Sequence, residues 1–284
     1  MNKKYLTLSG LILIIILLMG TNLFNPQVAS SKSQNPLSLG FEVVSNSQGI
    51  TLYQKDLDYV QVVNLTEGAS VNFIYGEIAN LGIGKGAYDG NDPQFERETI
   101  SQVWSNLSSE NQSLFCLTNG QFFRNDQNSS TGLAFPVKSD GIIVSDGYAG
   151  EIEFPDEKLM LAVWDNKALI TKFKPIYLKL STAPNIIVSL QENADKGREK
   201  KTGRTFVGVE DRDGDRLNET ILIFTSKKAT QPHAAQVLKS FGATQVMMLD
   251  GGGSTQLICQ GNSYISSSRT IPQMIAVFSG EASK

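Results

Sequence analysis

The chain has 284 residues, of which 25 are basic and 28 are acidic, and its formal net charge is −3. An acidic balance argues against general nucleic-acid binding, because that binding needs a basic face that displaces counterions. His233 is the single histidine. Ser-His-Asp, Cys-His and polyhistidine zinc chemistry would all depend on this one residue, so they are disfavoured. We expect His233 to be a surface or hydrogen-bonded histidine in a helix.

The first 30 residues have the layout of a secretory signal peptide. Lys3 and Lys4 precede the apolar run 6–19, and small residues follow at 28–30. The run is shorter than the roughly 20 residues that span a bilayer, and an uncleaved N-terminal anchor is the alternative. In both cases we expect an exported protein, in the periplasm, at the cell surface or secreted. Membrane contact would occur only through an uncleaved N-terminal segment.

The rest of the chain is expected to form one domain. Residues 31–39 are polar and contain proline, which predicts a disordered leader. Residues 40–284 contain no repeat and no linker, and short alternating runs outnumber helical patterns without a regular strand–helix alternation. We therefore predict an α+β fold, a single strand-rich domain with a mixed β-sheet and a few flanking helices.

The predicted elements follow from hydrophobic periodicity. Helical spacing of apolar residues predicts helices at 94–106 and at 234–241, the second extended back toward Thr230. Glycine-rich residues 82–90 predict a loop, and 138–141 a hairpin turn. Strands are predicted at 50–53, 59–63, 70–74, 113–118, 205–209, 220–224, 245–249, 255–259 and 273–278, with further strands between 131 and 189. The run before Asp250 is apolar enough to be a central strand buried on both faces.

Cys116 and Cys259 are the two cysteines, too few for a disulfide framework and without metal-binding spacing. Each lies beside one of the motifs described below, so the two can be close in space. An exported location permits a disulfide, and two buried free thiols are the alternative.

The sharpest motif carries a carboxylate from a buried strand into three glycines. Its residues are Asp250, Gly251, Gly252, Gly253, Ser254 and Thr255. Without Cβ atoms, the glycines let a ligand approach their amides, and such amides can form an anion-binding concavity. The two hydroxyls add donors. A flexible turn is the alternative, but an apolar strand that runs directly into an aspartate is poorly suited to a linker.

Three weaker features accompany this motif. They are Asn119, Gly120, Gln121, Phe122 and Phe123 at a strand exit, Arg204 and Thr205 at a strand start, and Arg269 on a serine-rich loop. Asparagine can pair with sugar hydroxyls, aromatic rings can wall a sugar pocket, and arginine offers a planar fork to phosphate. Singly, each has a structural explanation: a turn before core phenylalanines, or a surface arginine. The rest of the basic cluster 196–204 is expected to be a solvated loop.

Together the four features resemble the phosphodiester glycosidase family, typified by a lysosomal uncovering enzyme. That family has an Asn-Gly-Gly-Phe-Phe element, an Arg-Thr before a glycine-containing strand (here Gly208), a Leu-Asp-Gly-Gly-Gly-Ser-Ser element and a late arginine. Order and spacing fit from about residue 99 to residue 278. Two positions depart from the pattern. Gln121 replaces a glycine and could alter which sugar fits, and Thr255 replaces a serine but keeps the hydroxyl.

The resemblance implies cleavage of a sugar-1-phosphodiester between the anomeric carbon and the phosphate oxygen, on a sugar-phosphate or phosphoglycan substrate and without a required cofactor. Phosphate leaves readily, so the reaction needs charge stabilisation and a carboxylate near the anomeric carbon rather than strong acid catalysis. On this hypothesis Arg204, Arg269 and the glycine amides bind phosphate, and Asn119 holds sugar hydroxyls. Asp250 acts as base or nucleophile, or stabilises the cationic carbon. All are expected to share one cleft.

Two further hypotheses are kept. Asp211, Asp213 and Asp215, near Asn218 in a hairpin tip, could offer oxygen ligands to calcium. Gly214 comes one place earlier than the glycine of an EF-hand loop, so a solvated acidic turn is the alternative. The rival function is a non-catalytic envelope protein that binds glycans or phosphoglycopolymers through the same pocket.

Overall fold

The computed structural model describes residues 34–281, and the predicted signal peptide lies outside the described residues. The expectation of a disordered leader is wrong for its last residues. Pro36–Leu39 forms a 3-10 turn, because the side chain of Asn35 accepts a hydrogen bond from the amide of Leu37 and so caps the turn. The ordered body therefore begins before residue 40.

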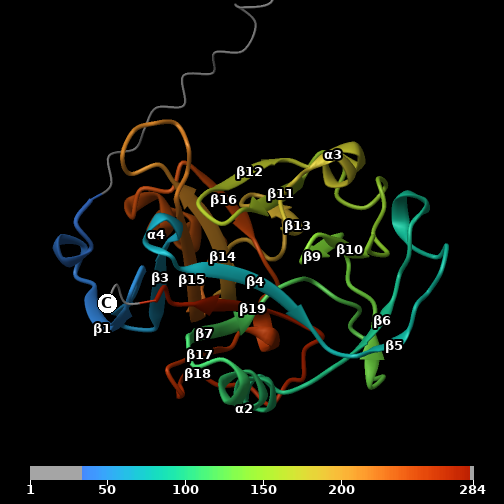
Figure 1. Cartoon of the computed structure of the whole chain (residues 1–284), viewed down its shortest axis with the longest axis horizontal. Coiled ribbons are helices and arrows are strands. Elements are labelled where there is room, and N and C mark those ends of the chain that lie inside the picture. Colours follow the sequence, from blue (N-terminus) through green and yellow to red (C-terminus); the bar gives the residue numbers. More distant parts are fainter. Residues whose placement is uncertain (1–33, 282–284) are drawn as a thin grey trace, which may run out of the picture. The chain divides into compact units, whose positions relative to one another are not determined.

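An 11-stranded sheet is the largest layer of the body (Figure 1). Its order is β1-β2-β3-β15-β14-β16-β13-β11-β12, with the β9–β10 hairpin joined to β13. The strands are β1 Glu42–Ser47, β2 Ile50–Lys55, β3 Asp58–Asn64, β9 Val137–Ser139, β10 Ile142–Ser145, β11 Lys158–Val163, β12 Ala168–Lys172, β13 Asn185–Gln191, β14 Thr202–Glu210, β15 Thr220–Ala229 and β16 Gln245–Met248. The expected hairpins β9–β10 and β14–β15 are both present.

Two smaller sheets complete the strand structure. A five-stranded sheet has the order β18-β17-β7-β19-β4, and a three-stranded sheet the order β5-β6-β8. Their strands are β4 Ser70–Tyr75, β5 Ile78–Asn80, β6 Gln94–Glu96, β7 Leu114–Asn119, β8 Ser130–Thr131, β17 Leu257–Cys259, β18 Asn262–Ile265 and β19 Gln273–Phe278. Strands thus formed in each of the nine segments predicted individually from hydrophobic pattern.

The predicted mixed sheet is wrong, because the strand pairings within residues 34–281 are antiparallel throughout. The insertion of β16 explains how the large sheet avoids a parallel pair. It lies between β13 and β14 and runs opposite to both, with Met248 opposite Leu190 on one side and Phe206 on the other. β16 is therefore central and buried, as its composition predicted.

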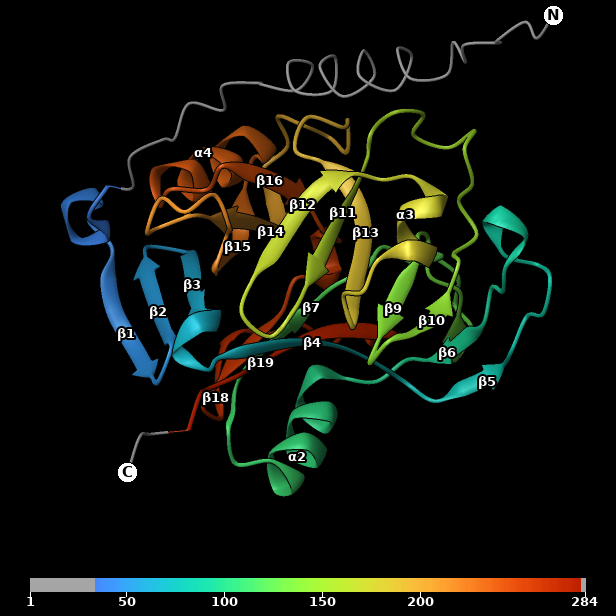
Figure 2. The ribbon, with the colours of Figure 1, turned by 45° about the horizontal axis from the view of Figure 1, so that its top comes forward.

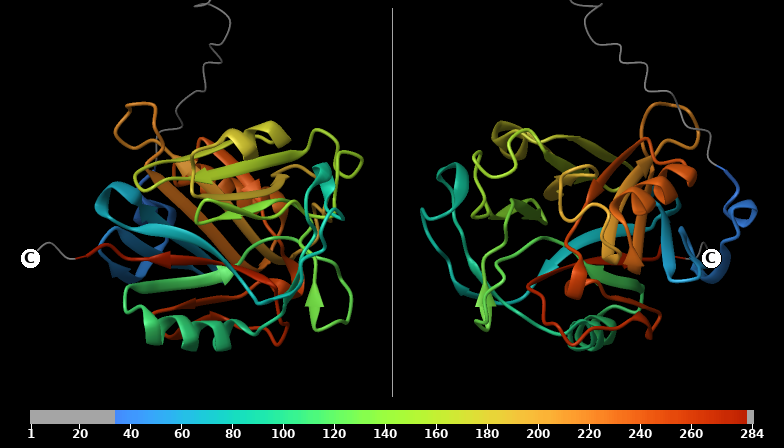
Figure 3. Two further views of the ribbon diagram at one scale, coloured as in Figure 1. Left: turned by 45° about the vertical axis from the view of Figure 1, so that its right-hand side comes forward. Right: turned by 180° about the vertical axis from the view of Figure 1, so that it is seen from behind.

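The layers stack as helix, large sheet, five-stranded sheet and helix (Figures 2 and 3). α4 Gln231–Ser240 covers one face of the large sheet, where Leu238 packs with Phe206 and Phe224. The opposite face packs on the five-stranded sheet, and α2 Ile100–Glu110 lies against β7 and β17. Burial on both sides of two sheets provides most of the apolar contact that holds the body together.

Helix α2 differs from its prediction at 94–106. It begins later because Thr99 and Gln102 form a reciprocal capping box, in which each side chain accepts from the other residue's amide. The preceding residues Gln94–Glu96 instead pair as β6. A strong cap therefore decided the boundary that apolar spacing alone placed too early.

Helix α4 was predicted correctly, and Thr230 caps its first turn. His233 lies in it with an exposed side chain, and its Nε2 is 2.6 Å from Oδ2 of Asp58, so the expected satisfied histidine is confirmed. The short helix α3 Pro175–Leu180 was not predicted. No helix within the described part of the chain has the length and apolarity needed to cross a bilayer.

Cys116 and Cys259 form a disulfide bond, which resolves the alternative left open above. The two residues are directly opposite in the β7–β17 ladder and are completely buried. The bond joins the strand that leads to Asn119 with the strand that follows the glycine motif. It therefore closes a loop of 143 residues that contains most of the large sheet.

Replacement of both cysteines by alanine should lower the free energy of unfolding by about 3 kcal/mol, because the cross-link restricts the unfolded chain. Urea unfolding of the oxidised wild type and the double variant measures the difference. The reduced wild type is the control and should unfold like the variant. Equal midpoints for the oxidised wild type and the variant would contradict a stabilising bond.

Candidate active site

Asp250 lies where β16 leaves the large sheet, and Asn119 holds it there. The amide nitrogen of Asn119 donates to the carbonyl of Asp250 at 2.7 Å. Its amide oxygen accepts from the hydroxyl of Thr205 at 2.8 Å and from the amide of Gln256 at 3.3 Å. The amide of Asp250 also donates to the carbonyl of Gly120. Two of the predicted motifs are therefore in direct contact.

The glycine motif turns sharply after Asp250. Gly252 has φ +62°, a conformation that a residue with a side chain adopts only with strain. Gly203, at the start of β14, lies so close that a Cβ there would be 2.3 Å from the carbonyl oxygen of Gly252. The amide of Gly251 donates to the Asp250 carboxylate, whereas the amides of Gly252 and Gly253 have no acceptor among residues 34–281. Two of the three predicted anion-binding amides are therefore free.

The Asp250 carboxyl group is partly exposed, yet protein atoms enclose most of it. This burial raises its pKa to about 6. The nearby Ser254 hydroxyl, the Gly251 amide and the charges of Arg269 and Lys196 act in the opposite direction and keep the pKa from rising further. A carboxyl group with this pKa can exchange protons near neutral pH, which is the property expected of a catalytic acid or base.

Arg269 is the predicted arginine that reaches the site. Its guanidinium carbon lies 4.9 Å from the centroid of the Phe123 ring, and its Nη2 donates to Asn125 at 2.9 Å. Within residues 34–281 it has no carboxylate at ion-pair distance. The hydroxyl of Ser267 holds its loop by donating to the carbonyl of Gly253. The arginine is thus fixed beside the glycine motif with an unpaired charge.

Arg204 does not have the geometry expected of a phosphate ligand. It is 4% exposed, and its five N–H groups have five protein acceptors. These acceptors are the carbonyls of Lys196, Gly197, Lys200 and Ala229 and the side-chain oxygen of Gln231. A guanidinium has no further donors, so we revise its role from ligand binding to the support of loop 192–200.

Other predicted residues also form the frame of the site. The Thr205 hydroxyl bonds Asn119 and is completely buried. Gln121 is 2% exposed and its side-chain amide donates to the carbonyl of Val188. Its side chain therefore points into the protein. This orientation does not support the prediction that Gln121 alters which sugar fits. Phe122 remains half-buried.

Buried polar atoms without partners gather beside Asp250. The hydroxyl of Thr255 and the side-chain oxygen of Gln256 are buried and have no hydrogen-bond partner within the described residues, whereas the Ser254 hydroxyl is hydrogen-bonded to the Asp250 carboxylate. Buried polar atoms in folded proteins are rarely left unpaired. These groups are therefore candidates for contact with a polar ligand or with water at the site.

Lys196, Tyr148 and Phe154 lie around the candidate site, and no sequence pattern pointed to them. Lys196 Nζ lies 5.2 Å from the Phe122 ring centroid and 5.1 Å from that of Phe154. Burial raises the pKa of Tyr148, and the negative charge of Asp250 contributes. Nothing in the sequence distinguished Lys196 from the other cations of its loop, and the two aromatic residues are outside every motif.

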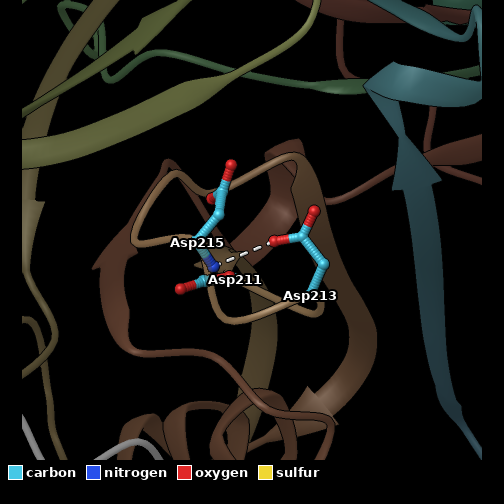
Figure 4. Close-up of side chains that lie close together, drawn as sticks. All are labelled: Asp211, Asp213 and Asp215. Atoms are coloured by element: carbon cyan, nitrogen blue, oxygen red, sulfur yellow. Dashed lines mark hydrogen bonds between the residues drawn. The ribbon is translucent and has the colours of Figure 1, made fainter.

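The acidic hairpin is a separate feature of the fold (Figure 4). Carboxylate oxygens of Asp211, Asp213 and Asp215 lie within 4.8 Å of one another. Each carboxylate already accepts backbone amides of the same turn: Asp211 from Gly214 and Arg216, Asp213 from Asp215, and Asp215 from Leu217. The structure thus brings the three residues together, and these bonds account for much of their arrangement.

The fold and the site define a class of protein: a strand-rich domain in which a proton-exchanging carboxylate, unpaired cations and aromatic rings surround a glycine turn. The phosphodiester glycosidase sequence profile matches residues 96–278. Since this is more than half of the chain, the protein belongs to the phosphodiester glycosidase family. No curated protein matches its sequence.

One solved structure is similar to this chain in fold. The catalytic domain of zebrafish N-acetylglucosamine-1-phosphodiester alpha-N-acetylglucosaminidase, auto-inhibited by its pro-peptide, is similar to this chain with a TM-score of 0.54 and 15% identity. The match covers 84% of this chain and 81% of the zebrafish one. A hypothetical protein from Synechocystis is matched with a TM-score of 0.48 and 12% identity over 84% of this chain and 64% of its own.

The raised pKa of Asp250 predicts a defined pH dependence of stability. Between the unfolded value near 4 and the folded value of about 6, the folded state binds more protons. Stability should therefore fall as pH rises through this window and level off above it. Asp250→Asn should remove the contribution of this residue to the slope and make the protein more stable at pH 7 by about 1–3 kcal/mol.

Urea unfolding at intervals from pH 4 to pH 8 measures the effect. Asp213→Asn is the matched control, because it removes a carboxylate from the acidic hairpin, and it should keep the slope of the wild type. An unchanged slope in Asp250→Asn would mean that this carboxyl group is not the one with the raised pKa.

Proposed function

We propose that the protein is an exported hydrolase that cleaves sugar-1-phosphodiesters between the anomeric carbon and the phosphate oxygen. Membership of the phosphodiester glycosidase family supports glycosidase chemistry on a sugar phosphodiester. The observation that carries the proposal is Asp250, a carboxylate with a pKa of about 6 on a rigid strand end, with the unpaired charge of Arg269 near it. A carboxylate beside an anion-binding group is what the bond cleavage requires.

In the proposed reaction, Asp250 acts as a general base. It removes a proton from a water molecule whose oxygen attacks the anomeric carbon, while the bond between that carbon and the phosphate oxygen breaks. The electron pair of the broken bond leaves with a phosphate monoester. A pKa of about 6 makes most of the carboxylate available as a base at pH 7 and still able to take a proton. A nucleophilic role for the same carboxylate is the mechanistic alternative.

On the phosphate side we assign Arg269 and the free amides of Gly252 and Gly253. Charge-assisted hydrogen bonds to a departing phosphate grow stronger as the negative charge develops. Arg204 is not included, because its donors are all used within the protein. The reaction needs no metal, because a phosphate monoester leaves readily once its charge is stabilised.

On the sugar side we assign the unpartnered hydroxyl of Thr255 and the hydroxyl of Ser254, which also bonds the Asp250 carboxylate. Asn119 is 1% exposed, and its side chain is held by Asp250, Thr205 and Gln256, so we revise its role from binding sugar hydroxyls to positioning Asp250. Phe122 and Phe123, on the segment that follows Asn119, would supply apolar walls. The zebrafish relative is named for an alpha-N-acetylglucosaminyl phosphodiester, so that sugar is the first substrate to test.

The proposed location is outside the cytoplasm, in the periplasm, at the surface or secreted. The signal-peptide pattern of the first 30 residues supports export, and the buried disulfide agrees with an oxidising compartment. The partner is a sugar phosphate or phosphoglycan rather than a nucleic acid. The rival, a glycan-binding envelope protein, would bind the same ligands without releasing a sugar.

Asp250→Asn should lower the turnover of an alpha-N-acetylglucosaminyl phosphodiester by at least about a hundredfold, because the base is lost. Released reducing sugar, measured with the purified mature chain, gives the rate. Asp213→Asn is the control and should retain the wild-type rate. Near-normal turnover in Asp250→Asn would reject the catalytic assignment.

A wild type that binds such diesters but releases no sugar from any of a panel would favour the rival function. The panel should vary the sugar and the group on the far side of the phosphate. Binding is measured on the same samples by calorimetry. Binding without sugar release indicates a non-catalytic binder, whereas the absence of both indicates that the panel lacks the right substrate.

For the acidic hairpin we favour a solvated turn over a calcium site, since its carboxylates are engaged by backbone amides. Calorimetric titration with calcium should show no binding tighter than about 1 mM, the weak end of protein calcium sites. Asp213→Asn serves as the comparison. Saturation at micromolar calcium that is lost in this variant would establish the calcium site instead.

A further inference from the structure

Besides Arg269, a second cation affects Asp250. This cation is Lys196, in the basic cluster that was expected to be a solvated loop. The charges of Arg269 and Lys196 both act on the Asp250 carboxylate. Arg269 lies over the ring of Phe123 and Lys196 over the ring of Phe122. These rings are consecutive in the chain and pack into different cores, so the two cations approach the segment from its two sides.

The main chain of Lys196 is anchored far more firmly than a solvated loop requires. Its amide donates to the side-chain oxygen of Gln231 at 3.0 Å, and its carbonyl accepts from Nη1 of Arg204 at 3.1 Å. Gln231 is completely buried and Arg204 nearly so. Both anchors are in the body of the fold, on α4 and β14. The position of residue 196 is therefore set by the core.

The side chain of Lys196, by contrast, has no ionic partner. It is exposed, and within residues 34–281 no carboxylate lies within 4.0 Å of its Nζ. Its neighbours are the faces of Phe122 and Phe154. Ring faces attract an ammonium group but do not neutralise its charge. The cation is thus held in place and remains available to an anion.

Besides Arg204, the buried cation Lys158 stabilises this region. It holds the loop that carries Phe154, one of the two rings next to Lys196. The ammonium group of Lys158 donates to the carbonyls of Gly150, Glu153 and Phe154. Lys158 is 4% exposed, so it holds the loop that carries Phe154 much as Arg204 holds the loop that carries Lys196. The main chain of Lys196 and the ring of Phe154 beside it are therefore both held by buried donors rather than by loose surface contacts.

We propose that Lys196 is a ligand-binding residue that binds the phosphate of the substrate together with Arg269. The inference rests on the proposed function for the identity of the ligand. Phosphate binding was first expected of Arg204. The inference assigns it to Lys196, whose carbonyl Arg204 holds. It also predicts selectivity: a phosphodiester should be favoured over a neutral glycoside of the same sugar, because two cations face the leaving group.

The test uses methyl phosphate, which resembles the phosphate monoester released by the reaction. Its binding to the purified mature chain is measured by calorimetry at low ionic strength. Lys196→Met keeps the length and apolar stem of the side chain but removes the charge, and should weaken binding about tenfold, the loss expected for one charge-assisted contact. Lys196→Arg should keep binding within about threefold, because it restores the charge.

Lys201→Met is the matched control, since it removes one positive charge from the same basic cluster at an exposed position. It should bind methyl phosphate like the wild type. Equal binding by Lys196→Met and the wild type, an equal loss in Lys201→Met, or no binding by the wild type would each overturn the inference. The assay needs no turnover, so it separates this inference from the proposed function. Sugar release with methyl phosphate binding unaffected by Lys196→Met would leave the hydrolase intact and reject Lys196.

Discussion

The site depends on the side chain of Asn119, which joins the two main sheets at one point. It lies at the end of β7 in the five-stranded sheet and contacts Thr205 of β14 and the carbonyl of Asp250 in the large sheet. It also accepts the amide of Gln256, just before β17. Because one buried amide satisfies groups from three other chain segments, Asp250 cannot move without breaking a hydrogen bond in a place where water cannot replace it.

Buried cations organise the loops around this point. Arg204 and Lys158 do not face a ligand, and their N–H groups donate to backbone carbonyls of loops that would otherwise lack partners. Burial lowers the pKa of Lys158, with nearby carboxylates acting in the opposite direction. Such donors convert irregular segments into rigid supports, which suits residues that must be held accurately. The cations that remain accessible at the site are Arg269 and Lys196, not these two buried residues.

Asp250 shows how function and stability oppose each other here. Its enclosure by protein raises its pKa, so ionisation at neutral pH costs folding free energy. The unpartnered hydroxyl of Thr255 adds to that cost. Disulfide Cys116–Cys259 and the two apolar layers offset it elsewhere in the fold. Local costs of this kind are common at sites that bind and transform ligands.

The sequence by itself determined the strands, α4 and the motif at Asp250, because periodicity, caps and glycine runs act over a few residues. It placed α2 too early, since the capping box at Thr99 outweighed the apolar spacing. The antiparallel order of the large sheet was decided by where β16 inserts. Only the tertiary structure separated Arg204 from Lys196. Both are cations of one cluster in the chain. Folding buries the guanidinium group of Arg204 among carbonyls and leaves the ammonium group of Lys196 between two rings. This contrast depends on segments that are far apart in sequence.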